Sequence, residues 1–144
     1  LINDKLNFLF RVHPVLNKSI DFKNKLINKN IKFSSQKDIE SDFKKSDVIL
    51  YSGSSVCVQA VMQGIIPIYY RSHPGEFSRD PLYEINRFTI KNKIELELKL
   101  NSLFKNKSTL SLKHKMYNLE KYCGLYFTKF NHNVLVKVLN KTKN

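Results

Sequence analysis

Residues 47–71 alternate between two kinds of apolar pattern, and this alternation restricts the possible folds more than any other feature of the chain. The run DVILYS (47–52) is short and almost wholly apolar, which is typical of a strand buried on both faces. Residues 54–63 have apolar side chains at helical spacing, and Gly64 is placed to end that helix. IIPIYYR (65–71) predicts a second strand. A strand, a helix and a strand in succession form a βαβ unit, whose strands run parallel.

The same alternation extends to both sides of this unit. Further strands are predicted at 7–12, 31–34 and 87–90. Further helices are predicted at 15–29, 35–46, 93–104, 111–122 and 131–142. Residues 93–104 carry apolar residues at alternate positions, as a strand would, but their length and charge pairs favour a helix. We therefore expect an α/β fold with a doubly wound, Rossmann-like parallel sheet of about four to five strands. Helices would cover both faces, and residues 91–144 would be mostly helical.

The length of 144 residues allows one domain with a hydrophobic core, and we predict a single domain over residues 1–144. The chain begins at Leu1 and soon enters an apolar run, so we expect it to be a portion of a longer protein. No apolar run approaches the roughly 20 residues that cross a bilayer, and no signal peptide is recognisable. The two cysteines, Cys57 and Cys123, lack metal-binding spacing and are predicted to be reduced thiols.

The formal net charge of +13 favours anionic partners, which include nucleic acids, phosphorylated substrates and acidic lipid headgroups. Lysine and asparagine are nevertheless frequent in every part of the chain, and such a composition raises the charge without creating a binding face. The basic residues form no arginine-rich stripe and are not interleaved with stacking aromatic residues. We therefore attribute most of the excess charge to composition and expect no nucleic-acid partner.

Polar residues follow three of the predicted strands at the point where each strand ends. These segments are His13-Pro14, Ser52-Gly53-Ser54-Ser55 and Arg71-Ser72-His73-Pro74. In doubly wound sheets, ligands bind at the carboxyl ends of the strands. The three segments are therefore expected to meet at one rim of the sheet and to form a binding site there.

The serine turn, which we define as residues 52–55, has the composition of a phosphate site. A helix N-terminus carries unsatisfied backbone N–H groups and partial positive charge, which attract anions. Gly53 permits a tight turn and a close approach of the backbone, while Ser54 and Ser55 add hydroxyl donors. The same residues also fit a simpler interpretation, in which one serine caps the helix and the glycine makes a turn. No Gly-Lys-Ser/Thr string follows, so the segment is not a Walker loop.

The residues before and within the His-Pro pairs also have a ligand-binding interpretation and a structural one. Pro14 favours an extended conformation at His13, which would hold the imidazole over the rim, near a phosphate or a base carbonyl. A lone histidine is more often structural. Arg11 and Arg71 are further candidates for the nucleotide site, since Arg71 in particular could offer charge to a phosphate. His73 is interpreted as a turn residue.

Three strings together resemble a known family. FRVHP (10–14), DVILYSGSS (47–55) and VQAVMQGIIPIYY (58–70) look like the C-terminal, donor-binding half of GT-B glycosyltransferases. The likeness is to bacterial enzymes with cytidine-nucleotide donors: sialyltransferases with His-Pro and Ser-Ser motifs, capsule Kdo transferases and polyglycerolphosphate-type transferases. The resemblance covers about residues 7–75, roughly half of the chain.

The resemblance implies a donor site and a reaction. The nucleotide and phosphate contacts that it implies are those of His13, Pro14, Ser52, Gly53, Ser54 and Ser55. Gln59 stands where many GT-B enzymes carry a glutamate that holds the ribose hydroxyls, and glutamine would bind ribose without charge assistance. The implied reaction transfers a sugar from a nucleotide, with CMP the expected one, to a hydroxyl of a surface-glycan or glycolipid acceptor. The serine turn would stabilise the leaving phosphate.

The same resemblance places the acceptor site and the catalytic base in a preceding N-terminal domain, so this chain alone is expected to be inactive. No pair of carboxylates is placed for general base catalysis. Asp47 opens a buried strand and is expected to be structural, while Glu40 and Asp42 lie on a polar helix and are expected to be solvated. No D-x-D string is present, and neither a metal ion nor another cofactor is expected.

Two other interpretations stay open. Another GT-B enzyme, such as a sugar-nucleotide epimerase or a glycerophosphotransferase, would keep the phosphate turn and change the chemistry. A non-enzymatic basic domain would instead bind nucleic acid, although no recognised nucleic-acid motif is present. The resemblance also implies a cytoplasmic location, with the lysines of the C-terminal helices either touching the anionic inner face of the membrane or forming an ordinary solvated face.

Overall fold

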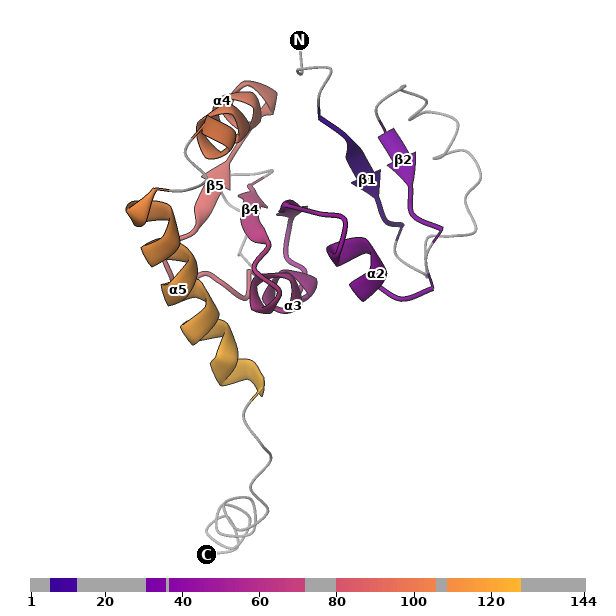
Figure 1. Cartoon of the computed structure of the whole chain (residues 1–144). Coiled ribbons are helices and arrows are strands. Elements are labelled where there is room, and N and C mark those ends of the chain that lie inside the picture. Colours follow the sequence, from indigo (N-terminus) through magenta and orange to yellow (C-terminus); the bar gives the residue numbers. More distant parts are fainter. Residues whose placement is uncertain (1–5, 13–30, 36, 72–79, 106–108, 128–144) are drawn as a thin grey trace, which may run out of the picture.

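The computed structural model of the chain describes residues 6–12, 31–35, 37–71, 80–105 and 109–127 (Figure 1). Its strands are β1 (Phe8–Phe10), β2 (Ile31–Phe33), β3 (Val48–Tyr51), β4 (Ile66–Tyr70) and β5 (Phe88–Ile90). Its helices are α2 (Glu40–Phe43), α3 (Val56–Met62), α4 (Lys93–Lys105) and α5 (Leu110–Gly124), and the short 3-10 helix η2 (Leu125–Phe127) follows. The helices predicted at 15–29 and 131–142 lie outside the described residues.

The α/β class and the parallel strands are confirmed, but the described strands form two small sheets. β1 pairs with β2, and a second sheet has the strand order β3-β4-β5. Every pairing is parallel. The expected single sheet of four to five strands is therefore not seen in this part of the chain.

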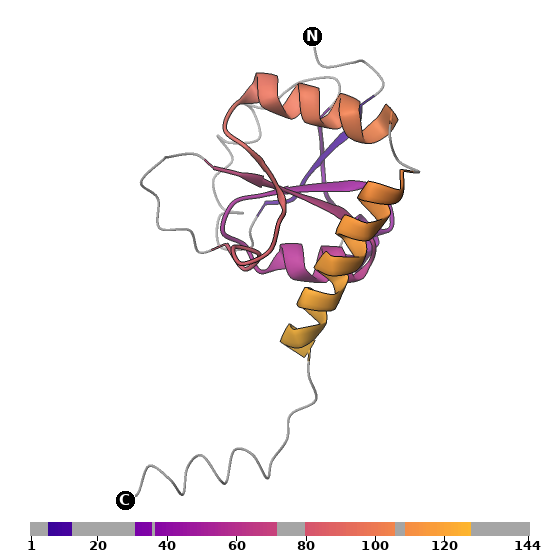
Figure 2. The ribbon, with the colours of Figure 1, turned by 90° about the vertical axis from the view of Figure 1, so that its left-hand side faces the viewer.

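β4 is the central strand of the larger sheet, and helices cover both of its faces. Figure 2 shows α4 on one side of this sheet and α3 on the other, with α5 running along the edge. Ile66 and Ile68 pack with Leu100 and Leu103 of α4. Tyr69 points the other way and packs with α3 and α5. Alternate side chains of β4 thus enter two separate apolar clusters, as the period of a strand requires.

The prediction that the strand at 47–52 is buried on both faces is wrong. Leu50 of β3 is 49% exposed, whereas the first four residues of β4 are buried. Within the described sheets, β3 has one neighbouring strand and β4 has two. Local composition does not separate the two cases, because both strands are almost wholly apolar.

The helix predicted at 35–46 is confirmed only as the single turn of α2. Its apolar contacts are few, since Phe43 is the one buried apolar residue of the helix and packs with Ala60 and Ile65. Helices in proteins are stabilised mainly by packing of an apolar face, and with so little apolar burial a longer helix here would not be stabilised. The segment before α2 instead forms a turn, in which the Ser41 backbone N–H donates to Asp38 Oδ1 at 2.7 Å.

Asp42 is buried, which corrects the expectation that it is solvated; Glu40 is exposed as expected. Arg11 Nη1, just after β1, donates to Asp42 Oδ2 at 2.5 Å. Ser34 Oγ, just after β2, donates to the same carboxylate at 2.7 Å. We call these three residues the Asp42 latch, because they tie the ends of β1 and β2 to α2.

Candidate functional site

The serine turn begins directly after β3, and α3 starts directly after the turn. Gly53 has a φ of 67°, a left-handed conformation that residues with a Cβ rarely adopt. Ser54 Oγ accepts a 3.4 Å hydrogen bond from the Val56 backbone N–H, and its carbonyl accepts one from Cys57. Ser54 therefore organises the start of the helix. Ser55 occupies the N-cap position, but its side chain makes no capping hydrogen bond.

The polar side chains of this region face outward. Ser52, Gly53, Ser55 and Gln59 are exposed, and Ser54 is half-buried. Ser55 and Gln59 are four residues apart, so they lie one turn apart on the same face of α3. The buried residues of the helix, among them Cys57, Val58 and Val61, face the core instead. The predicted position of both serines at a helix N-terminus is confirmed, and the helix adds Gln59 to the same exposed surface.

The register of the sheet brings Arg71 to the same rim. Tyr51 of β3 pairs with Tyr69 of β4, so the serine turn and Arg71 both follow the carboxyl ends of neighbouring parallel strands. The backbone N–H of Arg71 donates to Ile90 O of β5 at 2.9 Å, which anchors the end of β4. Adjacent strands are about 4.8 Å apart, so the backbone of Arg71 lies about one strand spacing from the end of β3, where the serine turn begins.

Other predicted site residues are not brought to this rim by the described structure. His13 and Pro14 lie outside the described residues, and so does the second His-Pro pair at 73–74. Arg11 belongs to the Asp42 latch, and it also donates to the backbone carbonyl oxygens of Lys37 at 3.0 Å and Asp38 at 3.2 Å. Its guanidinium thus has a structural part in joining β1 to α2.

A buried polar cluster contacts Tyr51, the residue before the serine turn, and no sequence pattern predicted it. Asp80 accepts hydrogen bonds from the Tyr51 hydroxyl and from the Leu82 backbone N–H, each at 2.9 Å, and forms an ion pair with Arg87 Nε. The Arg87 guanidinium stacks 5.0 Å from the ring centroid of Tyr69. The one local signal was Asp80-Pro81, which is typical of a turn and says nothing about a partner.

The cluster holds the end of β3 in place. Tyr51 is the last residue of β3 and directly precedes the turn, so its bond to Asp80 fixes where the turn begins. Burial raises the pKa of the Tyr51 hydroxyl far above its usual range, and the neighbouring Cys57 and Asp80 add to that rise. Tyr51 therefore stays a neutral donor at all physiological pH values.

The two cysteines are free and buried. Burial, followed by the charge of Asp80, raises the pKa of Cys57 to about 12. Burial also raises the pKa of Cys123 to about 11, with a further contribution from Glu120. Both groups are thiols rather than thiolates at neutral pH, so neither is activated as a nucleophile or a metal ligand.

The exposed surface of the turn and of α3 therefore offers hydroxyl and amide groups, which suit a ligand that carries phosphate and hydroxyl groups. Among the described residues, no three His, Cys, Asp or Glu side chains gather where they could hold a metal ion. In the same part of the chain, no helix has the length and apolar character needed to cross a membrane.

Comparisons with protein-family models, with curated proteins and with solved structures each found no match for this chain. A family membership is therefore not established. The support for any function has to come from the residues of this chain and from their arrangement.

Proposed function

We propose that this chain is the nucleotide-sugar donor domain of a GT-B glycosyltransferase, which transfers a sugar from a cytidine-nucleotide donor to a surface-glycan acceptor. The observation that supports this most is the exposed serine turn at the carboxyl end of β3, with Gly53 in a left-handed conformation. Arg71 ends the neighbouring strand and adds positive charge to the same rim. Hydroxyls, a close backbone and a cation are what a nucleotide phosphate requires.

In this proposal each donor has a role. Ser55 and Gly53 bind the phosphate, since the Ser55 hydroxyl makes no capping bond and the glycine allows the backbone to approach. Gln59 binds the ribose hydroxyls from one turn further along α3. Because α3 has only seven residues, we assign phosphate binding to these groups and to Arg71 rather than to the helix dipole. The Asp80 cluster positions the turn without touching the ligand.

We also propose how the two sheets combine and where this chain lies in the whole enzyme. The two parallel sheets would be parts of one doubly wound sheet with the order β2-β1-β3-β4-β5, which needs only a junction between the edges of β1 and β3. The chain would be the C-terminal half of a two-domain enzyme, whose other half supplies the acceptor site and the catalytic base. The chain by itself would bind a nucleotide without transferring sugar.

Nucleotide binding is tested by the melting temperature of the chain in the presence of CMP, UDP and GDP. A ligand at about 100 times its Kd adds about 2.7 kcal/mol of stability, so we expect CMP to raise Tm by roughly 5–10 °C and more than the other two. Ser55→Ala removes a hydrogen bond to a charged group and is expected to weaken CMP binding about tenfold or more. Gln59→Ala removes a neutral hydrogen bond and should weaken it about fivefold.

The matched control is Gln63→Ala, because Gln63 is an exposed glutamine at the opposite end of α3. Its binding constant should equal that of the unmodified chain. Equal loss in the Gln59 and Gln63 variants, or no Tm shift with any nucleotide, would refute the donor site. A Tm shift with single-stranded oligonucleotides alone would instead favour the nucleic-acid interpretation. Turnover of a sugar nucleotide by the isolated chain would contradict the proposal that the catalytic base lies in another domain, and would show that this chain supplies it.

A peripheral membrane contact is the second part of the proposal that can be tested. The described lysines of α4 and α5 are Lys93, Lys99, Lys105, Lys113, Lys115 and Lys121. Each lysine near an anionic surface contributes about 1 kcal/mol. Replacing the exposed pair Lys113 and Lys121 by glutamine should therefore lower partitioning onto phosphatidylserine vesicles about thirtyfold at low salt.

Vesicle co-sedimentation measures this effect. The control replaces Lys32 and Lys37, an exposed pair in the other half of the chain, and should leave partitioning nearly unchanged. Binding should also weaken as salt is added. Equal recovery on neutral and anionic vesicles would remove the membrane from the proposal.

A further inference from the structure

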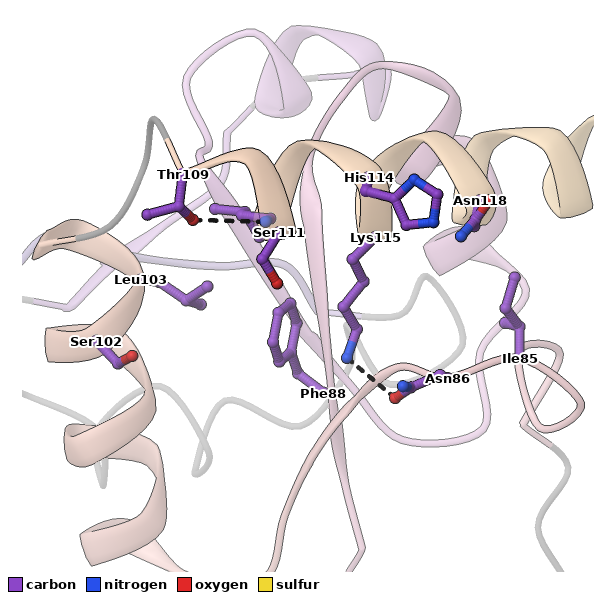
Figure 3. Close-up of a pocket in the computed structure, with 11 residues that line it drawn as sticks. Ile85, Asn86, Phe88, Ser102, Leu103, Thr109, Ser111, His114, Lys115 and Asn118 are labelled. Carbon is purple, nitrogen blue, oxygen red and sulfur yellow. Dashed lines mark hydrogen bonds between the residues drawn. The ribbon is translucent and has the colours of Figure 1, made fainter.

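A pocket lies between β5, α4 and α5 (Figure 3). Its residues are well separated in sequence from the serine turn. Its volume is about 460 Å³, which is within the usual range of small-molecule sites. The residues that line it are Ile85, Asn86, Phe88, Ser102, Leu103, Thr109, Ser111, Leu112, His114, Lys115 and Asn118. None of them belongs to the serine turn or to the Asp80 cluster.

The pocket has positive charge and no acidic residue in its lining. Lys115 reaches in from α5, where its Nζ donates to Asn86 Oδ1 at 3.1 Å and lies 3.9 Å from the ring centroid of Phe88 (Figure 3). Lys99 of α4 places a second ammonium 5.1 Å from the same ring. Burial lowers the pKa of Lys115, and the charge of Lys99 lowers it further. Both ammonium groups thus contact the Phe88 ring, and Lys115 is the lysine that lines the pocket.

Neutral hydrogen-bonding groups complete the lining. Ser102 comes from α4, Thr109 is the N-cap residue of α5, and Ser111 lies in the first turn of α5 (Figure 3). Thr109 Oγ1 accepts from the Leu112 backbone N–H at 3.4 Å and keeps its own proton for donation. Asn118 can both donate and accept. Hydroxyl and amide groups of this kind match the hydroxyl groups of a sugar, and Phe88 and Leu103 offer apolar surface to its carbon atoms.

We propose that this pocket binds a small phosphorylated sugar, with the phosphomonoester against Lys115 and the sugar hydroxyls against the serine, threonine and asparagine side chains. A phosphomonoester carries a charge near −2 at neutral pH, and the Lys115 ammonium in the lining would attract it. The same chemistry occurs in free sugar phosphates and in phosphorylated inositol headgroups of lipids. The site is independent of the donor rim, and its test does not use the serine turn.

The test is calorimetric titration of the whole chain with glucose 6-phosphate, compared with glucose and with inorganic phosphate. Lys115→Gln is expected to weaken glucose 6-phosphate binding about tenfold or more, because it removes a charge-assisted hydrogen bond. Lys45→Gln is the matched control: it makes the same change at an exposed lysine outside the lining. Its binding constant should stay within about twofold of the original.

A second variant, Ser111→Asp, tests the pocket independently if the loss of Lys115 disturbs the fold. Ser111 is exposed in the first turn of α5, where an acidic residue favours the helix. The variant should therefore melt no lower than the original chain while losing about tenfold in affinity through repulsion of the phosphate. Equal weakening by Lys45→Gln, or unchanged affinity in Ser111→Asp, would overturn the proposal. No saturable binding by the unmodified chain below about 10 mM would overturn it as well.

A vesicle arm identifies the source of the phosphate. Vesicles of phosphatidylcholine with phosphatidylinositol 4-phosphate should displace glucose 6-phosphate from the unmodified chain if a lipid headgroup can enter the pocket. Retention of glucose 6-phosphate in the presence of these vesicles supports a free sugar phosphate as the ligand. Displacement that is equally strong with Lys115→Gln would show that the vesicles act elsewhere and would count against the pocket.

Discussion

Replacing Asp80 by asparagine is expected to lower the free energy of unfolding by about 3–5 kcal/mol. The Asp80 side chain is fully buried; it accepts hydrogen bonds from the Tyr51 hydroxyl of β3 and from the nearby Leu82 backbone N–H, and it forms an ion pair with Arg87. Asparagine keeps the shape but removes the charge, so Arg87 remains as a mostly buried cation without its carboxylate. Domains of this size are stable by about 5–15 kcal/mol, so the variant would lose a large part of its stability.

Urea denaturation followed by circular dichroism measures the effect. Glu84→Gln is the control, because Glu84 is an exposed carboxylate in the same loop and its loss should cost less than about 0.5 kcal/mol. Adding Arg87→Met to Asp80→Asn should recover part of the loss, since no uncompensated charge then remains. A loss below about 1 kcal/mol in Asp80→Asn would show that the ion pair does not hold the end of β3.

Replacing Asp42 by asparagine is expected to lower the local free energy of opening of β1 and β2 by about 2–3 kcal/mol. Asp42 receives hydrogen bonds from Arg11 and Ser34, which follow β1 and β2 respectively. A two-stranded sheet of three residues per strand is marginal alone and depends on such attachments. Amide hydrogen exchange in β1 and β2 should therefore accelerate roughly a hundredfold, while exchange in β3, β4 and β5 stays nearly unchanged.

Glu40→Gln provides the comparison for this experiment. Glu40 lies on the same helix, α2, two residues before Asp42, but it is exposed. Its replacement should change exchange in β1 and β2 by no more than a few fold. The latch is ruled out if Glu40→Gln and Asp42→Asn accelerate exchange equally, or if Asp42→Asn affects the larger sheet as strongly as the smaller one.

The amino-acid sequence by itself determined the local elements. The described strands and helices begin and end within two residues of their predicted bounds, apart from α2 and the short 3-10 helix η2, which was not predicted. The spacing of apolar residues and the residues that end helices or form turns are local properties of the sequence. They predicted these elements well: Gly64, expected to end a helix, takes a positive φ of 77° at the end of α3. The same local logic placed Ser54 and Ser55 at the start of that helix, since a turn between a strand and a helix needs small, hydrogen-bonding residues.

Only the tertiary structure decided which of these elements become neighbours. β3 and β4 have nearly the same composition, yet only β4 is central. Asp42 has the sequence context of a solvated carboxylate, and it is buried because Arg11 and Ser34 converge on it from other segments. Lys115 meets Asn86 from a distant part of the chain in the same way. Ion pairs and pockets of this kind join residues that are far apart along the chain, so the local spacing of apolar residues does not predict them. They form only when the sheets and helices pack together.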